Sequence, residues 1–157
     1  TRTLLESTHG KRPLFLKVAP DLDETAVRDI SEIVLAYGVD ALIVSNTTLQ
    51  RPDHLTGDDR TEDGGLSGQP LFQISTAVLR LFAQALAGRV PLIGVGGVHS
   101  GASALAKIKA GAVAVQLYSA LVFEGPGLAV RIATELDALL GAEGFNDVGE
   151  AVGAEKR

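Results

Sequence analysis

One stretch of the sequence decides the fold: Leu92-Ile93-Gly94-Val95-Gly96-Gly97. It is an apolar run that ends abruptly in two glycines, and a helical pattern begins after it, near Ser100. Because glycine has no Cβ, the chain can turn sharply at Gly96 and Gly97 and a ligand can approach its backbone closely. The following helix is expected to direct its positive end to the same place, so the stretch predicts a phosphate site.

The pattern of an apolar strand followed by an amphipathic helix occurs four times. This order predicts a parallel sheet with helices packed on it, and ligands in such sheets bind at the carboxyl ends of the strands. The strands are expected at 14–18, 41–44, 91–95 and 113–117. The helices are expected from a cap at Asp21 or Asp23 to Gly38, and at about 70–86, 100–110 and 126–140.

Two architectures of the α/β class fit four such units. One is a doubly wound open sheet, and the other is half of a (β/α)8 TIM barrel, which needs about 250 residues when whole. A phosphate site after the last two strands recurs in barrels, and the chain begins with Thr1 rather than Met, so both favour the C-terminal half of a barrel. We therefore expect a single partial domain over residues 1–157, with four β/α units at about 13–141 and an irregular tail after them.

Composition excludes several classes of function. The 14 basic and 19 acidic residues give a net charge of −5, which argues against a nucleic-acid partner. Cysteine is absent and the three histidines lie far apart, so neither a metal site nor a cysteine nucleophile is expected. No apolar run approaches the ~20 residues of a membrane span. The polar, glycine-rich segment 49–69 is long for a connection in a compact domain, which favours a functional or mobile loop.

Unusual residues lie at the carboxyl ends of all four predicted strands, which should bring them to one rim of the sheet: Lys17, Ser45-Asn46-Thr47, Gly96-Gly97 and Tyr118-Ser119. Lys17 is interpreted as a buried cation that faces an anionic ligand, with a lysine that reaches solvent as the alternative. Asn46 can donate and accept at once, which suits a planar ligand with carbonyl and N–H groups, although a turn cap is the alternative.

Taken together, these motifs resemble the C-terminal half of the class 2, quinone-dependent dihydroorotate dehydrogenases over nearly the whole chain. The motifs are Leu16-Lys17-Val18-Ala19-Pro20-Asp21-Leu22, Ser45-Asn46-Thr47-Thr48, Gly64-Gly65-Leu66-Ser67-Gly68-Gln69-Pro70-Leu71, Ile93-Gly94-Val95-Gly96-Gly97-Val98 and Gln116-Leu117-Tyr118-Ser119-Ala120. The resemblance implies an eight-fold α/β barrel with FMN at its top. It also implies oxidation of dihydroorotate to orotate in pyrimidine (UMP) biosynthesis, with quinone as the electron acceptor.

The resemblance also implies roles for individual residues. Lys17 would lie beside the flavin ring and Ser45 would contact FMN, while Asn46 and Thr47 would hold dihydroorotate or orotate. The FMN phosphate would be held by a set of glycines and backbone groups: Gly68, Gly96, Gly97, Tyr118 and Ser119. The catalytic base, a serine in this class, is expected upstream of Thr1, so no catalytic residue is assigned in this chain.

The parts that the resemblance places upstream include the quinone tunnel and the segment that touches the membrane. They imply a peripheral protein on the cytoplasmic side of the inner membrane, if the source is bacterial. A separate half-barrel would expose strand edges and apolar surface and is expected to self-associate. Two alternatives remain open: another FMN-binding barrel oxidoreductase, or a non-catalytic half-barrel that keeps only a phosphate site.

Overall fold

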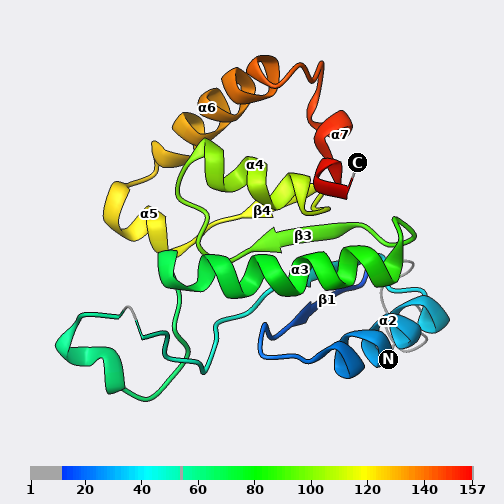
Figure 1. Cartoon of the computed structure of the whole chain (residues 1–157), viewed down its shortest axis with the longest axis horizontal. Coiled ribbons are helices and arrows are strands. Elements are labelled where there is room, and N and C mark those ends of the chain that lie inside the picture. Colours follow the sequence, from blue (N-terminus) through cyan, green and yellow to red (C-terminus); the bar gives the residue numbers. More distant parts are fainter. Residues whose placement is uncertain (1–11, 54, 157) are drawn as a thin grey trace.

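A four-stranded parallel sheet forms the centre of the molecule, in the order β1-β2-β3-β4 (Figure 1). The structure is a computed structural model and describes residues 12–53 and 55–156. The strands are β1 (Phe15–Val18), β2 (Ala41–Val44), β3 (Leu92–Val95) and β4 (Ala114–Gln116). The strand order of a doubly wound sheet reverses at a switch point, whereas strands that follow one another in chain order form an arc of a barrel. The half-barrel prediction is therefore confirmed, and the doubly wound alternative is wrong.

Helices cover one face of this sheet. They include α2 (Glu24–Tyr37), α3 (Phe72–Leu86), α4 (Gly101–Lys109) and α6 (Leu128–Ala142). In the main core, Leu42, Val44 and Leu92 pack against Val34 of α2 and Phe82 of α3. Each large apolar side chain buried in this way stabilises the fold by about 1.5–3 kcal/mol. At the carboxyl ends of the strands, Lys17 and Asn46 are exposed, so this rim of the sheet is accessible.

The first strand differs from its prediction as a buried strand. Only Val18 of β1 is buried, and Phe15 is 51% exposed. Among the described strands, β1 pairs with β2 alone, and alternate side chains point to the face that none of the described helices covers. The partly exposed Ile43 and Ile93, aligned with Lys17 across the sheet, lie on that face too.

The helix ends follow local chemistry. Asp23 caps α2 by accepting a hydrogen bond from the Ala26 N–H at 2.8 Å, and Gly38 ends it in the left-handed conformation with φ 64°. The expected glycine stop after α3 is shifted by one residue, because Ala87 takes that conformation, with φ 48°, before Gly88. These ends fix where each connection to the next strand begins.

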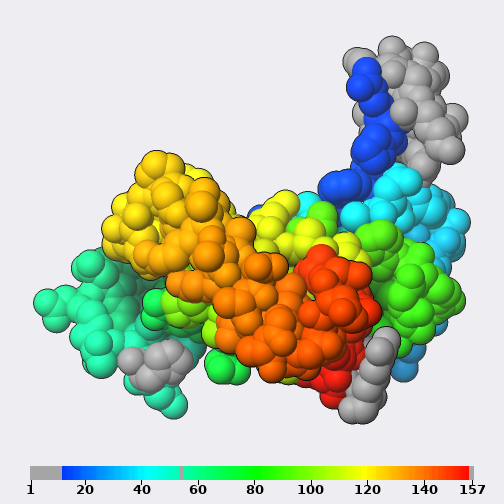
Figure 2. Space-filling view, turned by 90° about the horizontal axis from the view of Figure 1, so that it is seen from above, coloured from blue at the N-terminus to red at the C-terminus, as the bar shows by residue number. Residues whose placement is uncertain are grey.

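Several short helices were not predicted. α5 (Ser119–Glu124) directly follows β4, and η2 (Gln69–Leu71) precedes α3. The tail predicted as irregular contains α7 (Val148–Ala151) and η3 (Ala154–Lys156), and Ala151 is fully buried against α4 and α6. In Figure 2 these C-terminal residues (red) lie against α6 (orange), so the tail is part of the packed structure.

The short 3-10 turn η1 (Asp58–Thr61) lies in the long loop after β2, at the same end of the molecule as α5 (Figures 1 and 2). Within the described parts of the chain, no helix has both the length and the apolar character to cross a bilayer.

Candidate functional site

The carboxyl ends of the four strands surround one cavity of about 670 Å³. All nine residues that the sequence predicted as binding residues line it. They are Lys17, Ser45, Asn46, Thr47, Gly68, Gly96, Gly97, Tyr118 and Ser119. The expectation that these residues share one rim is thus correct for this structure. The cavity volume lies within the range of about 300–1,000 Å³ that is typical of cofactor and small-molecule sites.

The turn after β3 needs both of its glycines. Gly96 and Gly97 have φ values of 103° and 75°, which L side chains rarely adopt. A Cβ on Gly97 would lie 2.5 Å from the Phe72 Cβ and 2.7 Å from its Cα, because α3 begins directly behind the turn. Within the described residues, no acceptor takes a hydrogen bond from the N–H of Gly96 or Gly97. Two donors beside the cavity can therefore bind an anion.

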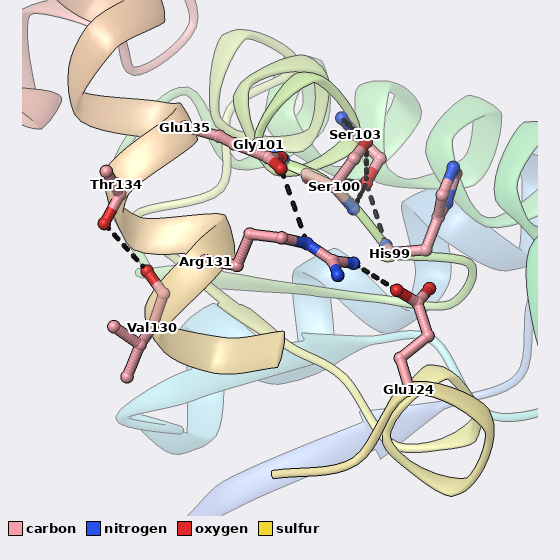
Figure 3. Close-up of polar contacts among 9 residues, drawn as sticks. All are labelled: His99, Ser100, Gly101, Ser103, Glu124, Val130, Arg131, Thr134 and Glu135. Atoms are coloured by element: carbon pink, nitrogen blue, oxygen red, sulfur yellow. Dashed lines mark hydrogen bonds and ion pairs between the residues drawn. The ribbon is translucent and has the colours of Figure 1, made fainter. Parts of the chain in front are cut away.

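The start of α4 is capped by the protein itself. The Ser100 side chain accepts from the Ser103 N–H at 3.2 Å, and the Ser103 hydroxyl accepts from the Ser100 N–H at 2.9 Å. The Gly101 N–H donates to the Glu135 carboxylate of α6 at 2.6 Å (Figure 3). A carboxylate of the protein already accepts from one N–H at the positive end of this helix, and the part of this end in phosphate binding stays a prediction.

A chain of charges connects α4, α6 and α5. Arg131 of α6 lies between Glu135, at 3.5 Å, and Glu124 of α5, to which it donates a hydrogen bond (Figure 3). The hydrogen bond to Glu124 raises the pKa of Arg131. This chain ties the end of α5 to α6, and α5 begins at Ser119, which lines the cavity.

The segment after β2 is held by its backbone and presents its side chains to the cavity. The Asn46 N–H donates to the Val18 carbonyl at 2.7 Å, which continues the pairing of β1 and β2. Ser45 is only 1% exposed, and its hydroxyl donates to the Asn46 carbonyl at 2.8 Å. The side chains of Asn46 and Thr47 are exposed in the cavity wall, where they can bind a ligand.

The ends of the long loop are pinned beside this segment. Thr48 and Leu66 form an antiparallel bridge with N–H···O distances of 3.1 and 2.8 Å. Asp21, which the sequence offered as a cap for α2, instead accepts hydrogen bonds from the Thr48 hydroxyl and from the Leu49 N–H. A Cβ on Gly65 would lie 1.9 Å from the Thr47 Oγ1, so the loop closes tightly against the Thr47 side chain.

Lys17 lines the cavity but is exposed. The expectation that its ammonium is buried is therefore wrong for this chain, while its role toward an anionic ligand stays a prediction. The cause of the exposure is the position of β1, which lies at the edge of the described sheet and has one face that no described helix covers. The ammonium keeps the placement at the rim that the sequence predicted.

The remaining predicted residues come from the loop before η2 and from the start of α5. Gly68 has φ 78°, and a Cβ there would lie 3.8 Å from that of Ser119. The Ser119 hydroxyl donates to Ser67 at 2.9 Å, which joins the loop before α3 to the start of α5. The Tyr118 side chain is 81% exposed, so it does not pack against the rim of the sheet.

Some residues at the site were not predicted. His99 lines the cavity, and its Nδ1 lies 2.8 Å from the Gly97 carbonyl oxygen, so a histidine without a predicted role at the site holds the glycine turn. Lys107 of α4 is fully buried behind the same turn. A signal for it existed, because Lys107 lies on the helix face of Ala104 and Ile108, where an apolar residue is expected.

The family model and two similar sequences carry the same family description. The family model described as "Dihydroorotate dehydrogenase" matches residues 2–140. A protein from Xanthobacter autotrophicus named dihydroorotate dehydrogenase (quinone) is 53% identical over 148 residues, which are 94% of this chain and 42% of that protein. A relative of the same name from Azorhizobium caulinodans is 53% identical over 145 residues, or 92% of this chain and 41% of the relative.

Solved structures agree with the sequence relatives. The crystal structure of DHODH from Eimeria tenella in complex with ferulenol superposes with a TM-score of 0.90 at 42% identity. The match covers 96% of this chain and 40% of that one, so the chain spans about two fifths of the proteins it matches. On these matches, the chain belongs to the dihydroorotate dehydrogenase family.

Proposed function

We propose that this chain forms part of an FMN-dependent enzyme that oxidises (S)-dihydroorotate to orotate, with quinone as electron acceptor, in pyrimidine biosynthesis. The single observation that carries the proposal is the meeting of the predicted residues around one cavity. The names of the relatives, dihydroorotate dehydrogenase (quinone), support the same reaction.

The residues present fit the phosphate of FMN. Gly96 and Gly97 offer two N–H donors in a turn that a Cβ would fill, and Gly68 and Ser119 line the same cavity. Uncharged backbone donors in such a concave turn suit an anion. We propose that these residues and the Tyr118 backbone hold the phosphate, and that Ser45 contacts the flavin. When bound, FMN supplies the acceptor for the two electrons taken from dihydroorotate.

The segment after β2, which lines the same cavity, suits the substrate. Asn46 and Thr47 present an amide and a hydroxyl, which can pair with the carbonyl and N–H groups of a pyrimidine ring. The ammonium of Lys17 lies in the same wall and would stabilise negative charge that develops on the bound flavin. These residues would orient the substrate ring and stabilise charge on the flavin. They do not supply the base that removes the substrate proton.

That base, together with the quinone site, is proposed to lie in the part of the protein that the chain does not span. The same part is proposed to make the peripheral contact with the cytoplasmic side of the inner membrane. The matched proteins are more than twice as long as the chain, which leaves room for these elements.

The test uses the intact protein. We expect it to be purified yellow, to reduce a quinone analogue with dihydroorotate, and to bind orotate at the flavin, seen as a change in the flavin absorbance spectrum. Asn46→Ala should weaken orotate binding about tenfold or more, because a lost hydrogen bond that leaves its polar partner unpaired costs about 1–3 kcal/mol. Asn146→Ala, far along the chain in the C-terminal part, is the control.

Two results would reject the proposal. A yellow protein that oxidises another substrate and ignores orotate would favour a different FMN-binding barrel oxidoreductase. A colourless and inactive intact protein would favour the non-catalytic half-barrel.

The uncovered sheet face supports a further property of this chain when it is produced alone, namely self-association. Phe15 on that face is 51% exposed, and one edge of β1 is paired with no strand of the described residues. Sedimentation of the isolated chain should give a mass above that of a monomer, and Phe15→Lys should reduce it. A monomer at all concentrations would contradict this.

A further inference from the structure

Lys107 is the most unusual buried group near the site. It lies on α4, is fully buried, and has no carboxylate within ion-pair distance among the described residues. Its Nζ donates to the Ser75 hydroxyl at 2.6 Å and to the Val95 carbonyl at 3.2 Å, and lies 5.3 Å from the centre of the Phe72 ring. Burial of an ammonium without a carboxylate partner costs free energy of folding, so we expect the contacts of Lys107 to serve the site beside it.

These contacts hold the glycine turn from behind. Val95 is the last residue of β3, and its carbonyl belongs to the same peptide unit as the Gly96 N–H. The Ser75 hydroxyl, which accepts from Lys107, also lies 3.1 Å from the Gly96 carbonyl oxygen. In a trans peptide the carbonyl and the following N–H point in opposite directions. Fixing these two carbonyls on the side of Lys107 therefore directs the N–H groups of Gly96 and Gly97 away from it.

We propose that Lys107 is a positioning residue for phosphate: it fixes the Gly96-Gly97 turn through Val95 and Ser75, and its buried charge favours an anion on the opposite side of the turn. The proposal deepens the proposed function and rests on it, because the anion is taken to be the phosphate of FMN. Lys107 does not line the cavity, so it acts through the turn and not by direct contact.

The charges around Lys107 make this role sensitive to pH. Burial, with a smaller contribution from Arg80 of α3, lowers the pKa of Lys107 to about 7. Arg80 itself is paired with Glu155 of η3 at 2.6 Å. A bound phosphate favours the charged ammonium and so raises this pKa. Above pH 7 the binding of phosphate should then take up a proton, and affinity should fall as the pH rises.

The experiment compares FMN with riboflavin, which has the same ring system without the phosphate. Affinities of the intact apoprotein are measured by flavin fluorescence from about pH 7 to about pH 9, where the phosphate has already lost its second proton, with pKa about 6. The test variant is Lys107→Met. It leaves no polar atom unpaired. The Ser75 hydroxyl still donates to the Gly96 carbonyl, and the Val95 carbonyl still accepts from the Ser45 N–H at 3.2 Å. The control is Lys109→Met, which removes a lysine of the same helix that pairs with Glu143 at 2.7 Å.

We expect Lys107→Met to weaken FMN binding about tenfold, equal to about 1.4 kcal/mol, with riboflavin binding unchanged. The affinity for FMN divided by that for riboflavin should fall with rising pH in the wild type and in Lys109→Met. In Lys107→Met this ratio should not change with pH. Ser75→Ala, which keeps the charge and removes the link, should lower the ratio without removing its pH dependence.

The outcomes separate the two proposals. If the wild type prefers FMN to riboflavin but Lys107→Met keeps the same ratio and the same pH profile, the role of Lys107 is wrong and the proposed function stands. If the wild type binds both flavins equally or neither, the phosphate site is wrong and the inference is wrong with it. Should Lys107→Met fail to fold, a wild-type ratio that stays constant with pH would overturn the inference.

Discussion

Gly97→Ala gives the sharpest test of the cavity, because alanine adds a single methyl group at a position with no room for it. The new Cβ would lie 2.5 Å from the Phe72 Cβ, 2.7 Å from its Cα and 2.8 Å from its backbone nitrogen. Two of these three atoms are backbone at the start of α3 and cannot rotate away. The residue would also have to keep a φ of 75°, which disfavours any residue with a Cβ.

The cost has two parts. The left-handed conformation costs a non-glycine residue about 1–2 kcal/mol, and overpacking costs about 1–3 kcal/mol. Together they predict that the free energy of unfolding falls by about 2–5 kcal/mol if the turn stays in place. If the turn moves instead, the N–H groups of Gly96 and Gly97 leave the cavity wall, and FMN affinity falls tenfold for each 1.4 kcal/mol lost.

The assay measures both quantities on the intact protein, by denaturant unfolding of the apoprotein and by FMN titration. Gly127→Ala is the matched control, since Gly127 has φ −65° and an added Cβ there would have no atom within 4 Å. Stability and FMN affinity that are both equal to those of Gly127→Ala would refute the close packing of the turn against α3.

Three further changes test other parts of the molecule. Lys17→Ala should slow reduction of the flavin by dihydroorotate about a hundredfold or more, measured in a single turnover, with little change in stability because Lys17 is exposed. Gly65→Ala should weaken orotate binding but not FMN binding in titrations, because its Cβ would lie 1.9 Å from the Thr47 Oγ1. Glu155→Gln should lower the free energy of unfolding at pH 7 by about 0.2–1 kcal/mol, as expected for a partly exposed pair with Arg80. Arg80 lowers the pKa of Glu155, so this difference should disappear as the pH falls from the ordinary carboxyl value of 4.5 through the lowered one.

Each of these has a clear contrary result. A wild-type single-turnover rate in Lys17→Ala would remove the charge-stabilising role. Unchanged orotate affinity in Gly65→Ala, at the level of the roomy Gly57→Ala in the same loop, would show that the loop does not fix Thr47. A stability difference for Glu155→Gln that persists in acid would mean that its origin is not the ion pair.

The sequence predicted the arrangement of the site because its signals are local. The end of a strand can be recognised in the sequence at Gly96-Gly97 and at Ser45-Asn46. Because the strands are parallel, these ends lie together at one edge of the sheet. The exposure of Lys17 could not be predicted in this way. It depends on what covers the open face of β1, which is a property of the assembled sheet and not of the residues around it.

Tertiary pairing explains the other differences. The amphipathic pattern predicted a helix after Ser100, but only packing against α6 shows that Glu135 caps it. In the tail, α7 is only four residues long and is stabilised by burial of Ala151, so it leaves no periodic pattern to recognise. Lys107 does lie in a periodic pattern, on the face of Ala104 and Ile108, but a lysine in a helix is ordinarily assigned to the solvent-facing side, so its burial is not predicted.

The bridge between Thr48 and Leu66 has a practical consequence. It joins the two ends of the long loop before the chain reaches its tip near Gly57, so the strand ends do not depend on the tip for their position. Lengthening a loop whose base is already joined costs little, about 0.6 kcal/mol for each doubling. A peptide tag or a small reporter domain grafted beside Gly57 should therefore leave flavin binding intact.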